Sequence, residues 1–239
     1  MDFKLLKRKI YNLSHPVLGH ILMLHRVTDQ RSSNPNQREL EITPFFLENT
    51  IKKYIKQGKR FLSIDEACSI IKSGKRQKQP FVCLTFDDGY CDNYTIAYPI
   101  LKRLGVPFTI YVTTGFIDNR LPMWWYSNQQ FGLSFNELVA LDREPLCTIG
   151  AHTFCHPKLD TLSYEEQEKE IINSKTTLEQ WLGHTIHHFS YPHGAYNDTT
   201  LQIVKECGFT SCLRAWGGTI RRGNISMLEL PRIVLREDE

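Results

Sequence analysis

Short apolar runs alternate along the chain with longer stretches in which apolar residues recur every three or four positions. The short runs predict strands at residues 21–24, 81–86, 107–113, 146–150, 187–191, 209–213 and 230–235. The longer stretches predict helices at residues 46–57, 63–71, 94–104, 163–182 and 197–207, and another helix that begins near Ser134. Strands that alternate with helices indicate βα units around a largely parallel sheet. About seven such units favour closure of the sheet, so we predict an α/β fold, a distorted, TIM-like (β/α) barrel.

Several helix starts are marked by a serine with a glutamate three positions later, the pattern of a capping box. These pairs are Ser63 with Glu66, Ser134 with Glu137, and Ser163 with Glu166. No internal repeat or low-complexity linker divides the sequence. We therefore expect a single catalytic domain over residues 1–239, with its motif-bearing core at residues 21–235.

The composition excludes several classes of protein. With 41% apolar and 23% charged residues, the 239-residue chain is typical of a globular protein. A formal net charge of +3 is too small and too dispersed to indicate binding to nucleic acid. No apolar run reaches the length of about 18 residues that a transmembrane helix needs. Seven cysteines without framework spacing indicate a reducing compartment, so we expect a cytoplasmic protein whose oligomeric state the sequence leaves open.

Residues suited to catalysis recur where the predicted strands end. His25, the pair Asp87 and Asp88, His152 and the segment 191–194 all lie at or just beyond the carboxyl end of a strand. In α/β barrels this rim carries the active site. The repeated placement therefore predicts a functional site formed by segments far apart in the sequence.

Two of these segments together offer ligands for a metal ion. Adjacent carboxylates at Asp87 and Asp88 repel each other, so a cation or a shared proton must stabilise them. His152 and His156 add two imidazoles; with one carboxylate they form a ligand set that suits zinc and leaves a position open for water. Neighbouring residues at a strand end point in different directions, so one aspartate can bind metal while the other acts as a base. A thiolate role for Cys155 is the less favoured alternative, because no second cysteine lies nearby.

Further candidates lie around the same rim. His25 could protonate a departing amine, since a histidine is well suited to general-acid catalysis near neutral pH. Trp216 stands beside Gly217 and is predicted to line a pocket. The aromatic run at 124–126 could form either a sugar-stacking platform or an apolar lid.

At these motifs the chain resembles the polysaccharide deacetylase family, metal-dependent carbohydrate esterases that include chitooligosaccharide, peptidoglycan and poly-N-acetylglucosamine deacetylases. The segment 85–90, TFDDGY, is similar to the family's first motif, and the segment 152–156, HTFCH, to its second. The resemblance implies that Asp87 is the base and that Asp88, His152 and His156 hold a divalent metal, zinc with cobalt or nickel as alternatives. It also implies a distorted barrel of fewer than eight units, and it places Tyr90 among the substrate-binding residues.

The segment 189–194, FSYPHG, is similar to the third motif, but Ser190 replaces the arginine that orients the catalytic aspartate in the family. Arg232, in the last predicted strand, could supply that guanidinium from elsewhere. The backbone amide of His193 would then be the oxyanion donor. The same motif places three residues at the substrate: Tyr191, Pro192 and Gly194.

The family's later motif with a histidine acid has no match, because no histidine follows His193. In the branch of the poly-N-acetylglucosamine deacetylases the first strand ends in a Tyr-His-like pair, which Leu24 and His25 resemble. The resemblance therefore gives the acid role to His25.

The implied reaction removes an acetyl group from an N-acetylated amino sugar in a glycan. For a cytoplasmic enzyme, a nucleotide- or lipid-linked glycan precursor would be the expected partner. The alternatives are an O-acetyl esterase or N-deformylase acting on a sugar, and a catalytically inactive carbohydrate-binding relative. A metal-dependent phosphoesterase is less favoured, because neither a second metal site nor a cluster of phosphate-binding arginines is visible in the sequence.

Overall fold

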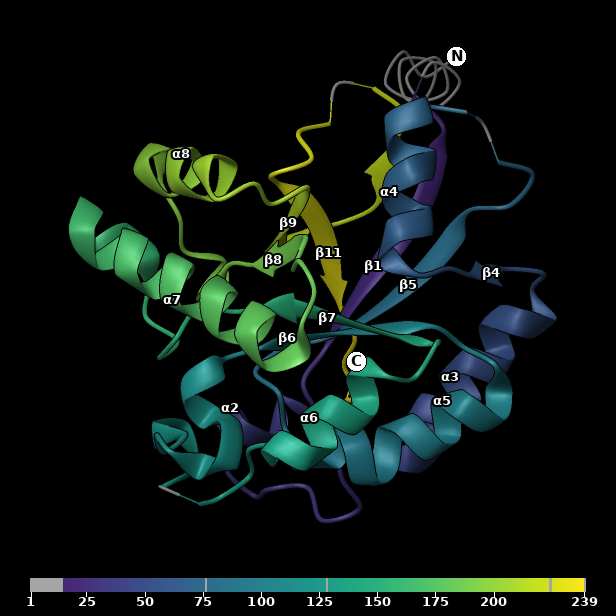
Figure 1. Cartoon of the computed structure of the whole chain (residues 1–239). Coiled ribbons are helices and arrows are strands. Elements are labelled where there is room, and N and C mark those ends of the chain that lie inside the picture. Colours follow the sequence, from purple (N-terminus) through teal and green to yellow (C-terminus); the bar gives the residue numbers. More distant parts are fainter. Residues whose placement is uncertain (1–14, 76, 128, 224, 239) are drawn as a thin grey trace.

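The computed structural model describes residues 15–75, 77–127, 129–223 and 225–238. Within these residues, seven parallel strands close into a barrel, in which the first strand pairs with both the second and the last (Figure 1). In order around the barrel they are β1 (Val17–Leu24), β5 (Phe81–Phe86), β6 (Phe108–Val112), β7 (Cys147–Ala151), β8 (His188–Ser190), β9 (Ser211–Gly217) and β11 (Leu230–Val234). The predicted distorted barrel is therefore confirmed, and each predicted strand has its counterpart in the wall.

Helices surround the barrel over most of its circumference (Figure 1). They are α2 (Pro35–Arg38), α3 (Pro44–Lys56), α4 (Ile64–Ser73), α5 (Tyr98–Leu104), α6 (Phe135–Asp142), α7 (Tyr164–Leu182) and α8 (Asp198–Glu206). The three predicted capping boxes are present at the starts of α4, α6 and α7. Across the described residues, no helix combines the length and the apolar character needed to cross a bilayer.

Some short elements were not predicted. The segment 28–38 contains α2, which Asn34 caps and Pro35 starts. A small parallel sheet joins β2 (Arg26–Val27) to β3 (Glu41–Ile42), β4 (Arg60–Phe61) extends the main sheet beside β5, and β10 (Ile220–Arg221) pairs antiparallel with β1. Strands of two residues are too short to produce a periodic pattern, so they cannot be predicted from alternation.

The side chains of β5 alternate between two cores. Val82, Leu84 and Phe86 belong to the larger cluster, which includes residues of the surrounding helices, whereas Phe81 and Cys83 belong to a second cluster with α4. Gly19 makes room for the Phe81 ring, since a Cβ at this position would lie 2.4 Å from it. Phe81 and Cys83, at odd-numbered positions, face the second cluster. Thr85 and Asp87 continue this alternation, so their side chains lie on the same face of the wall.

The link between β9 and β11 differs from the others. Parallel neighbours are usually joined by a helix that packs on the outside of the sheet. Here the chain runs from Gly217 through β10 and a loop to Leu230, without a helix in the described part of the segment. Within the described residues, this connection therefore places no helix on the outer face of the wall.

Candidate metal centre and active site

The two aspartates follow β5 directly, and both are buried. Asp87 continues the extended strand and its backbone N–H donates to the Leu24 carbonyl at 3.0 Å. Asp88 instead adopts a left-handed backbone with φ of 75°, and Gly89 follows with φ of 83°. This turn separates the two carboxylates, which is the division that the sequence predicted for adjacent residues at a strand end.

The histidine loop follows β7. The His152 Nδ1–H donates to the Ser190 carbonyl at 2.7 Å, which leaves Nε2 as the nitrogen with a free lone pair. Thr153 and His156 both have positive φ, and the Thr153 hydroxyl accepts from the His156 N–H at 3.1 Å. Non-glycine residues in this backbone region are strained, and such strain concentrates at functional sites.

Glu170 on α7 fastens the same loop from outside. Its carboxylate accepts the backbone N–H groups of Phe154 at 3.0 Å and Cys155 at 2.9 Å, and the Cys155 thiol at 2.8 Å. Partial burial and this carboxylate raise the pKa of Cys155 to about 12, so the thiol stays protonated and is a poor metal ligand. The less favoured thiolate role thus loses its physical basis. Glu170 is a positioning residue that no sequence motif marks.

The ligand atoms of three buried residues converge. Asp88 Oδ1 lies 3.2 Å from His156 Nε2 and 3.4 Å from His152 Nε2, and all three atoms lie within 4.8 Å of one another. Atoms bound at about 2.0–2.1 Å to a tetrahedral ion would be separated by roughly 3.3 Å. Asp88 Oδ1 is buried and has no hydrogen-bond partner among the described residues, as expected of an oxygen kept for an ion. The donor set therefore fits a zinc-like divalent metal.

Asp87 is held by Arg232, the residue predicted to replace the missing arginine. Two parallel hydrogen bonds join the groups, from Nη1 to Oδ1 at 2.7 Å and from Nη2 to Oδ2 at 2.6 Å. The other donors of Arg232 reach the Arg214 carbonyl, the Thr85 hydroxyl and the Ser190 hydroxyl, so all five N–H groups have partners. Ser190 also donates to Asp87 Oδ2 at 3.2 Å. The serine thus leaves room for the guanidinium and takes part in its network.

Electrostatics keep Asp87 ionised. Burial alone would raise the pKa of this carboxyl group, but the Arg232 guanidinium and nearby His152 outweigh burial and hold it below its ordinary value. The pKa of Asp88 lies well below its ordinary value for the same kind of reason, because burial is outweighed by His156 and His152. Two buried carboxylates therefore remain charged side by side.

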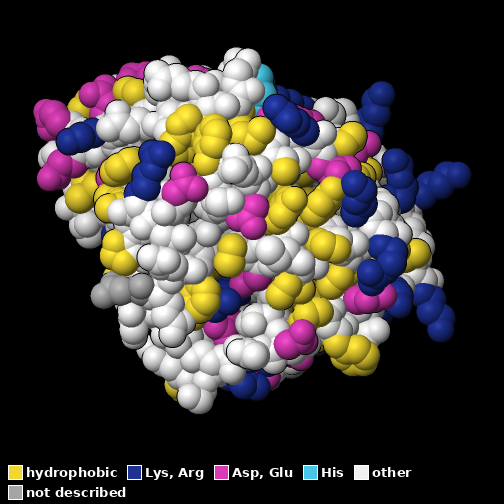
Figure 2. Space-filling view, turned by 60° about the horizontal axis from the view of Figure 1, so that its bottom comes forward, with side chains coloured by type: hydrophobic (Ala, Val, Ile, Leu, Met, Phe, Trp, Pro, Cys, Tyr) yellow, Lys and Arg dark blue, Asp and Glu magenta, His cyan; other side chains and the backbone are white. Residues whose placement is uncertain are grey.

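A cavity of about 430 Å³ opens onto this cluster. It is lined by metal-centre and other polar residues, including His25 and His193, and by an apolar set that includes Leu40, Trp124, Trp125, Tyr191, Ala215 and Trp216. Trp124 and Trp216 are exposed, at 64% and 60%. Figure 2 views the molecule from the lower side of Figure 1, and hydrophobic side chains gather across the middle of that face. The cavity can therefore hold a ring-shaped, partly apolar ligand beside the metal centre.

Two proposed catalytic groups lie at the cavity wall. His25 follows β1 directly, and burial lowers its pKa although Asp88 and Asp87 oppose the shift. His193 has a left-handed backbone with φ of 56° in the turn Pro192–Gly194, and its ring centroid is 4.5 Å from that of His156. The structure brings both residues to the place where the sequence predicted them.

The predicted substrate-binding residues divide into two groups. Tyr191 and Trp216 line the cavity. Tyr90 does not line it: its ring is fully buried, and its hydroxyl accepts the Trp125 indole N–H at 2.8 Å. Tyr90 therefore supports the tryptophan, and its predicted substrate contact stays a prediction. Pro192 and Gly194 also stay outside the lining; a Cβ at Gly194 would lie 2.9 Å from Ala215 and 3.0 Å from the Trp216 ring, so this glycine shapes the wall.

Two contacts at the cavity had no signal in the sequence. Glu39 and Arg236 meet at the cavity in an ion pair of 3.2 Å, although they are separated by almost the whole chain. Trp125 packs with its ring centroid 5.0 Å from that of His156. Such contacts depend on how the barrel closes and have no local pattern.

Comparisons with known proteins agree with this geometry. The sequence profile of the polysaccharide deacetylase family matches residues 74–212, more than half of the chain. YxkH of Bacillus subtilis, provisionally named a polysaccharide deacetylase, is 28% identical over 189 residues, 79% of this chain and 61% of that protein. The poly-β-1,6-N-acetyl-D-glucosamine N-deacetylase of Staphylococcus aureus is 25% identical over 222 residues, 87% of this chain and 72% of that protein. The deacetylase PplD of Streptococcus pyogenes, solved in complex with acetate, superposes with a TM-score of 0.80 at 28% identity, covering 92% of this chain and 93% of that one.

The chain belongs to the polysaccharide deacetylase family, a family of hydrolases that act on acetylated sugars. It spans 61% of the Bacillus subtilis relative and 51% of a Streptomyces coelicolor relative. The family profile, over residues 74–212, includes Asp88, His152 and His156.

Proposed function

We propose that the protein is a metal-dependent deacetylase that removes the acetyl group from an N-acetylated amino sugar in a glycan. The observation that carries the proposal is the convergence of Asp88, His152 and His156 beside an ionised Asp87, at the floor of one cavity. The metal-binding part follows from the buried oxygen of Asp88 that lacks a hydrogen-bond partner among the described residues. The catalytic role of Asp87 is inferred from its ion pair with Arg232.

Asp88, His152 and His156 would hold the ion, zinc in the first instance and cobalt or nickel as alternatives. When bound there, a divalent ion supplies Lewis acidity toward the acetyl carbonyl and lowers the pKa of a water molecule. The Ser190 carbonyl keeps His152 in the tautomer that such binding needs.

Asp87 serves as the base that takes the proton of the attacking water. Its two oxygens accept three hydrogen bonds, from Arg232 twice and from Ser190. A carboxylate has about four acceptor positions, so one remains for the water. The Arg232 fork fixes the orientation of the carboxylate and preserves its negative charge, which is what a general base must have before the reaction.

The remaining steps belong to the cavity wall. The backbone N–H of His193 donates to the oxygen that becomes negative in the tetrahedral intermediate. His25 gives a proton to the amine as the carbon–nitrogen bond breaks. Tyr191, Trp124 and Trp216 provide apolar surface against which a sugar ring can pack.

The N-acetyl preference is supported by two relatives. The Staphylococcus aureus protein is named for N-deacetylation of poly-β-1,6-N-acetyl-D-glucosamine, and PplD was solved with acetate, the small acid that such a reaction releases. We extend this chemistry to the present chain as a hypothesis about its substrate. The predicted cytoplasmic location stays a prediction.

The test is acetate release from β-1,6- and β-1,4-linked N-acetylglucosamine oligomers. Protein stripped of metal should release no acetate, and zinc, cobalt or nickel should restore release in proportion to the metal bound. O-acetylated and N-formylated sugars serve as competing substrates in the same assay. Bound metal without acetate release from any N-acetylated sugar would contradict the proposal, and faster turnover of an ester or a formamide would replace it.

A further inference from the structure

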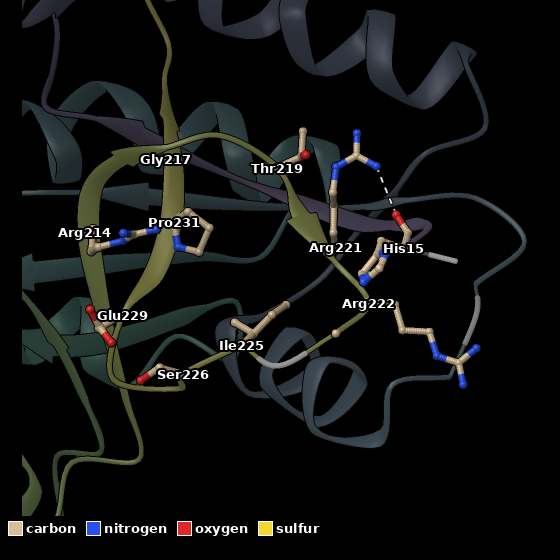
Figure 3. Close-up of a pocket in the computed structure, with 11 residues that line it drawn as sticks. His15, Arg214, Gly217, Thr219, Arg221, Arg222, Ile225, Ser226, Glu229 and Pro231 are labelled. Atoms are coloured by element: carbon tan, nitrogen blue, oxygen red, sulfur yellow. Dashed lines mark hydrogen bonds between the residues drawn. The ribbon is translucent and has the colours of Figure 1, made fainter. Parts of the chain in front are cut away.

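A second cavity, of about 680 Å³, lies where the helix between β9 and β11 is missing (Figure 3). Arg214 and Pro231 contribute to its lining from these two strands. Leu213 and Leu230, the preceding residues, belong to the second core cluster, so alternation along each strand places Arg214 and Pro231 on the opposite, outer face. The cavity shares no lining residue with the metal-centre cavity.

The lining of this basic cavity is positively charged. It contains the guanidinium groups of Arg214, Arg221 and Arg222 and the single carboxylate of Glu229. Glu229 accepts the hydroxyl of Tyr196 at 2.8 Å. In the described ranges, no carboxylate lies within 4.0 Å of the charged nitrogens of Arg214 or Arg222. The cavity therefore carries a formal excess of positive charge that the described residues do not neutralise.

Arg214 is held in place before any ligand arrives. Its Nε is buried without a hydrogen-bond partner among the described residues. A Cβ at Gly217 would lie 2.8 Å from Arg214 Nη2, so the guanidinium packs against the bare backbone of its own strand. A donor that is buried, oriented and unsatisfied gains most from an acceptor supplied by a ligand.

The opposite wall is also fixed. β10 pairs with the start of β1, and Arg221 Nη1 donates to the His15 carbonyl at 3.0 Å (Figure 3). Thr219 and Ser226 add hydroxyl groups to the lining. The cavity thus combines planar cationic forks with small polar donors.

We propose that the basic cavity is a second binding site, and that its ligand carries a phosphate ester or diphosphate group. Guanidinium groups bind phosphate oxygens in pairs, and a dianion offsets Arg214 and Arg222 better than a single carboxylate would. The volume admits a phosphorylated sugar, since ligand sites commonly measure about 300–1,000 Å³.

Calorimetric titration of the full chain tests this site. The protein is first freed of metal and chelator, so that a metal ion at the metal centre does not compete for the phosphate probe. The probes are inorganic pyrophosphate and N-acetylglucosamine 1-phosphate, and sedimentation with vesicles of phosphatidylglycerol or phosphatidylcholine forms a separate arm. The double variant Arg214→Gln/Arg222→Gln removes two guanidinium groups from the cavity. The matched control is Arg143→Gln, which changes an exposed arginine at the carboxyl end of α6 that does not line the cavity. Thermal melts and zinc binding check that each variant folds.

Wild type and the control should bind a phosphate probe, and the double variant should bind on the order of tenfold more weakly or worse. Binding of the soluble esters identifies a sugar phosphate or a similar small ligand. Binding only to phosphatidylglycerol vesicles, lost in the double variant, identifies a lipid headgroup as the source. Equal affinity of wild type and double variant, or no binding of any probe up to about 10 mM, would overturn the proposal. None of these readouts depends on deacetylase activity, so failure here and failure of the proposed reaction remain distinguishable.

Discussion

Two buried arginines in this protein have similar partners and different surroundings. Arg232 binds Asp87 through two parallel hydrogen bonds. Arg26 binds Asp92 through Nε at 2.7 Å and Glu41 through Nη1 at 3.2 Å. Both guanidinium groups are buried.

Their environments decide what each pair can do. Arg26 lies 3.7 Å from the centroid of the Phe131 ring and close to the rings of Tyr90 and Tyr126, and it does not line the metal-centre cavity. Asp87, by contrast, lines that cavity beside the metal ligands. The Arg26 pairs are therefore structural, because side chains enclose them. The Arg232–Asp87 pair is functional, because the carboxylate lines a cavity that a ligand can enter. The variants below separate the two cases.

The largest loss of activity should follow Arg232→Met. Asp87 then keeps its burial and loses its counter-charge, so its pKa rises and the base becomes protonated near neutral pH. We expect a fall in kcat/KM of about 10²–10⁴-fold at neutral pH, the usual contribution of a general base. The loss should shrink as the pH rises, because deprotonation restores the base. A loss that is independent of pH would indicate a purely structural role for Arg232.

A smaller loss of activity should follow the substitution His25→Gln. His25 is the residue directly before Arg26. The acid must be protonated, and burial lowers its pKa, so wild-type kcat/KM should decline with rising pH at a value below the ordinary histidine pKa of about 6.5. The variant should lose on the order of a hundredfold in rate at low pH, together with this alkaline limb. A variant that keeps the limb would show that another group donates the proton.

Arg26→Met should lower stability and spare the chemistry. It leaves Asp92 and Glu41 buried without their cation, which typically costs about 3–5 kcal/mol in the free energy of unfolding. Urea unfolding at low temperature measures that cost. The rate per molecule of zinc-loaded, folded protein should equal that of wild type; a large fall in this rate would break the distinction between the two arginines.

The smallest effect should come from Ser190→Ala. The change removes one hydroxyl that donates to Asp87 and accepts from Arg232, and leaves the fork intact. A net hydrogen bond of about 0.5–1.5 kcal/mol corresponds to roughly a tenfold change or less. Steady-state kinetics should show it mainly in kcat; a loss as large as that of Arg232→Met would mean that the serine, not the fork, orients the base.

The sequence predicted what local pattern and strand order determine. The barrel and its strand ends followed from periodicity, and the capping boxes followed from the spacing of serine and glutamate. The two histidines and one carboxylate followed from their placement at one rim, and the choice of Asp88 as that carboxylate followed from the family resemblance. Arg232 was reached because the missing arginine at position 190 required a substitute, and the structure supplies it from β11.

The remaining features depend on packing between distant segments. The burial of Tyr90 beneath Trp125, the hold of Glu170 on the histidine loop and the pairing of Glu39 with Arg236 each join elements with no common local signal. The basic cavity lies where the described part of the connection between β9 and β11 has no helix. No residue type in the sequence predicts this feature. Turn geometry at Asp88 and His156 likewise became visible only with the backbone angles.

The central claim is that Asp88 and the two histidines hold a metal while Asp87 acts as the base. The most direct test is Asp87→Asn, assayed for bound zinc and for acetate released from N-acetylglucosamine oligomers. The account predicts wild-type zinc stoichiometry with acetate release reduced by at least about a hundredfold. Loss of zinc from the Asp87→Asn variant, or acetate release by it close to that of wild type, would contradict the account.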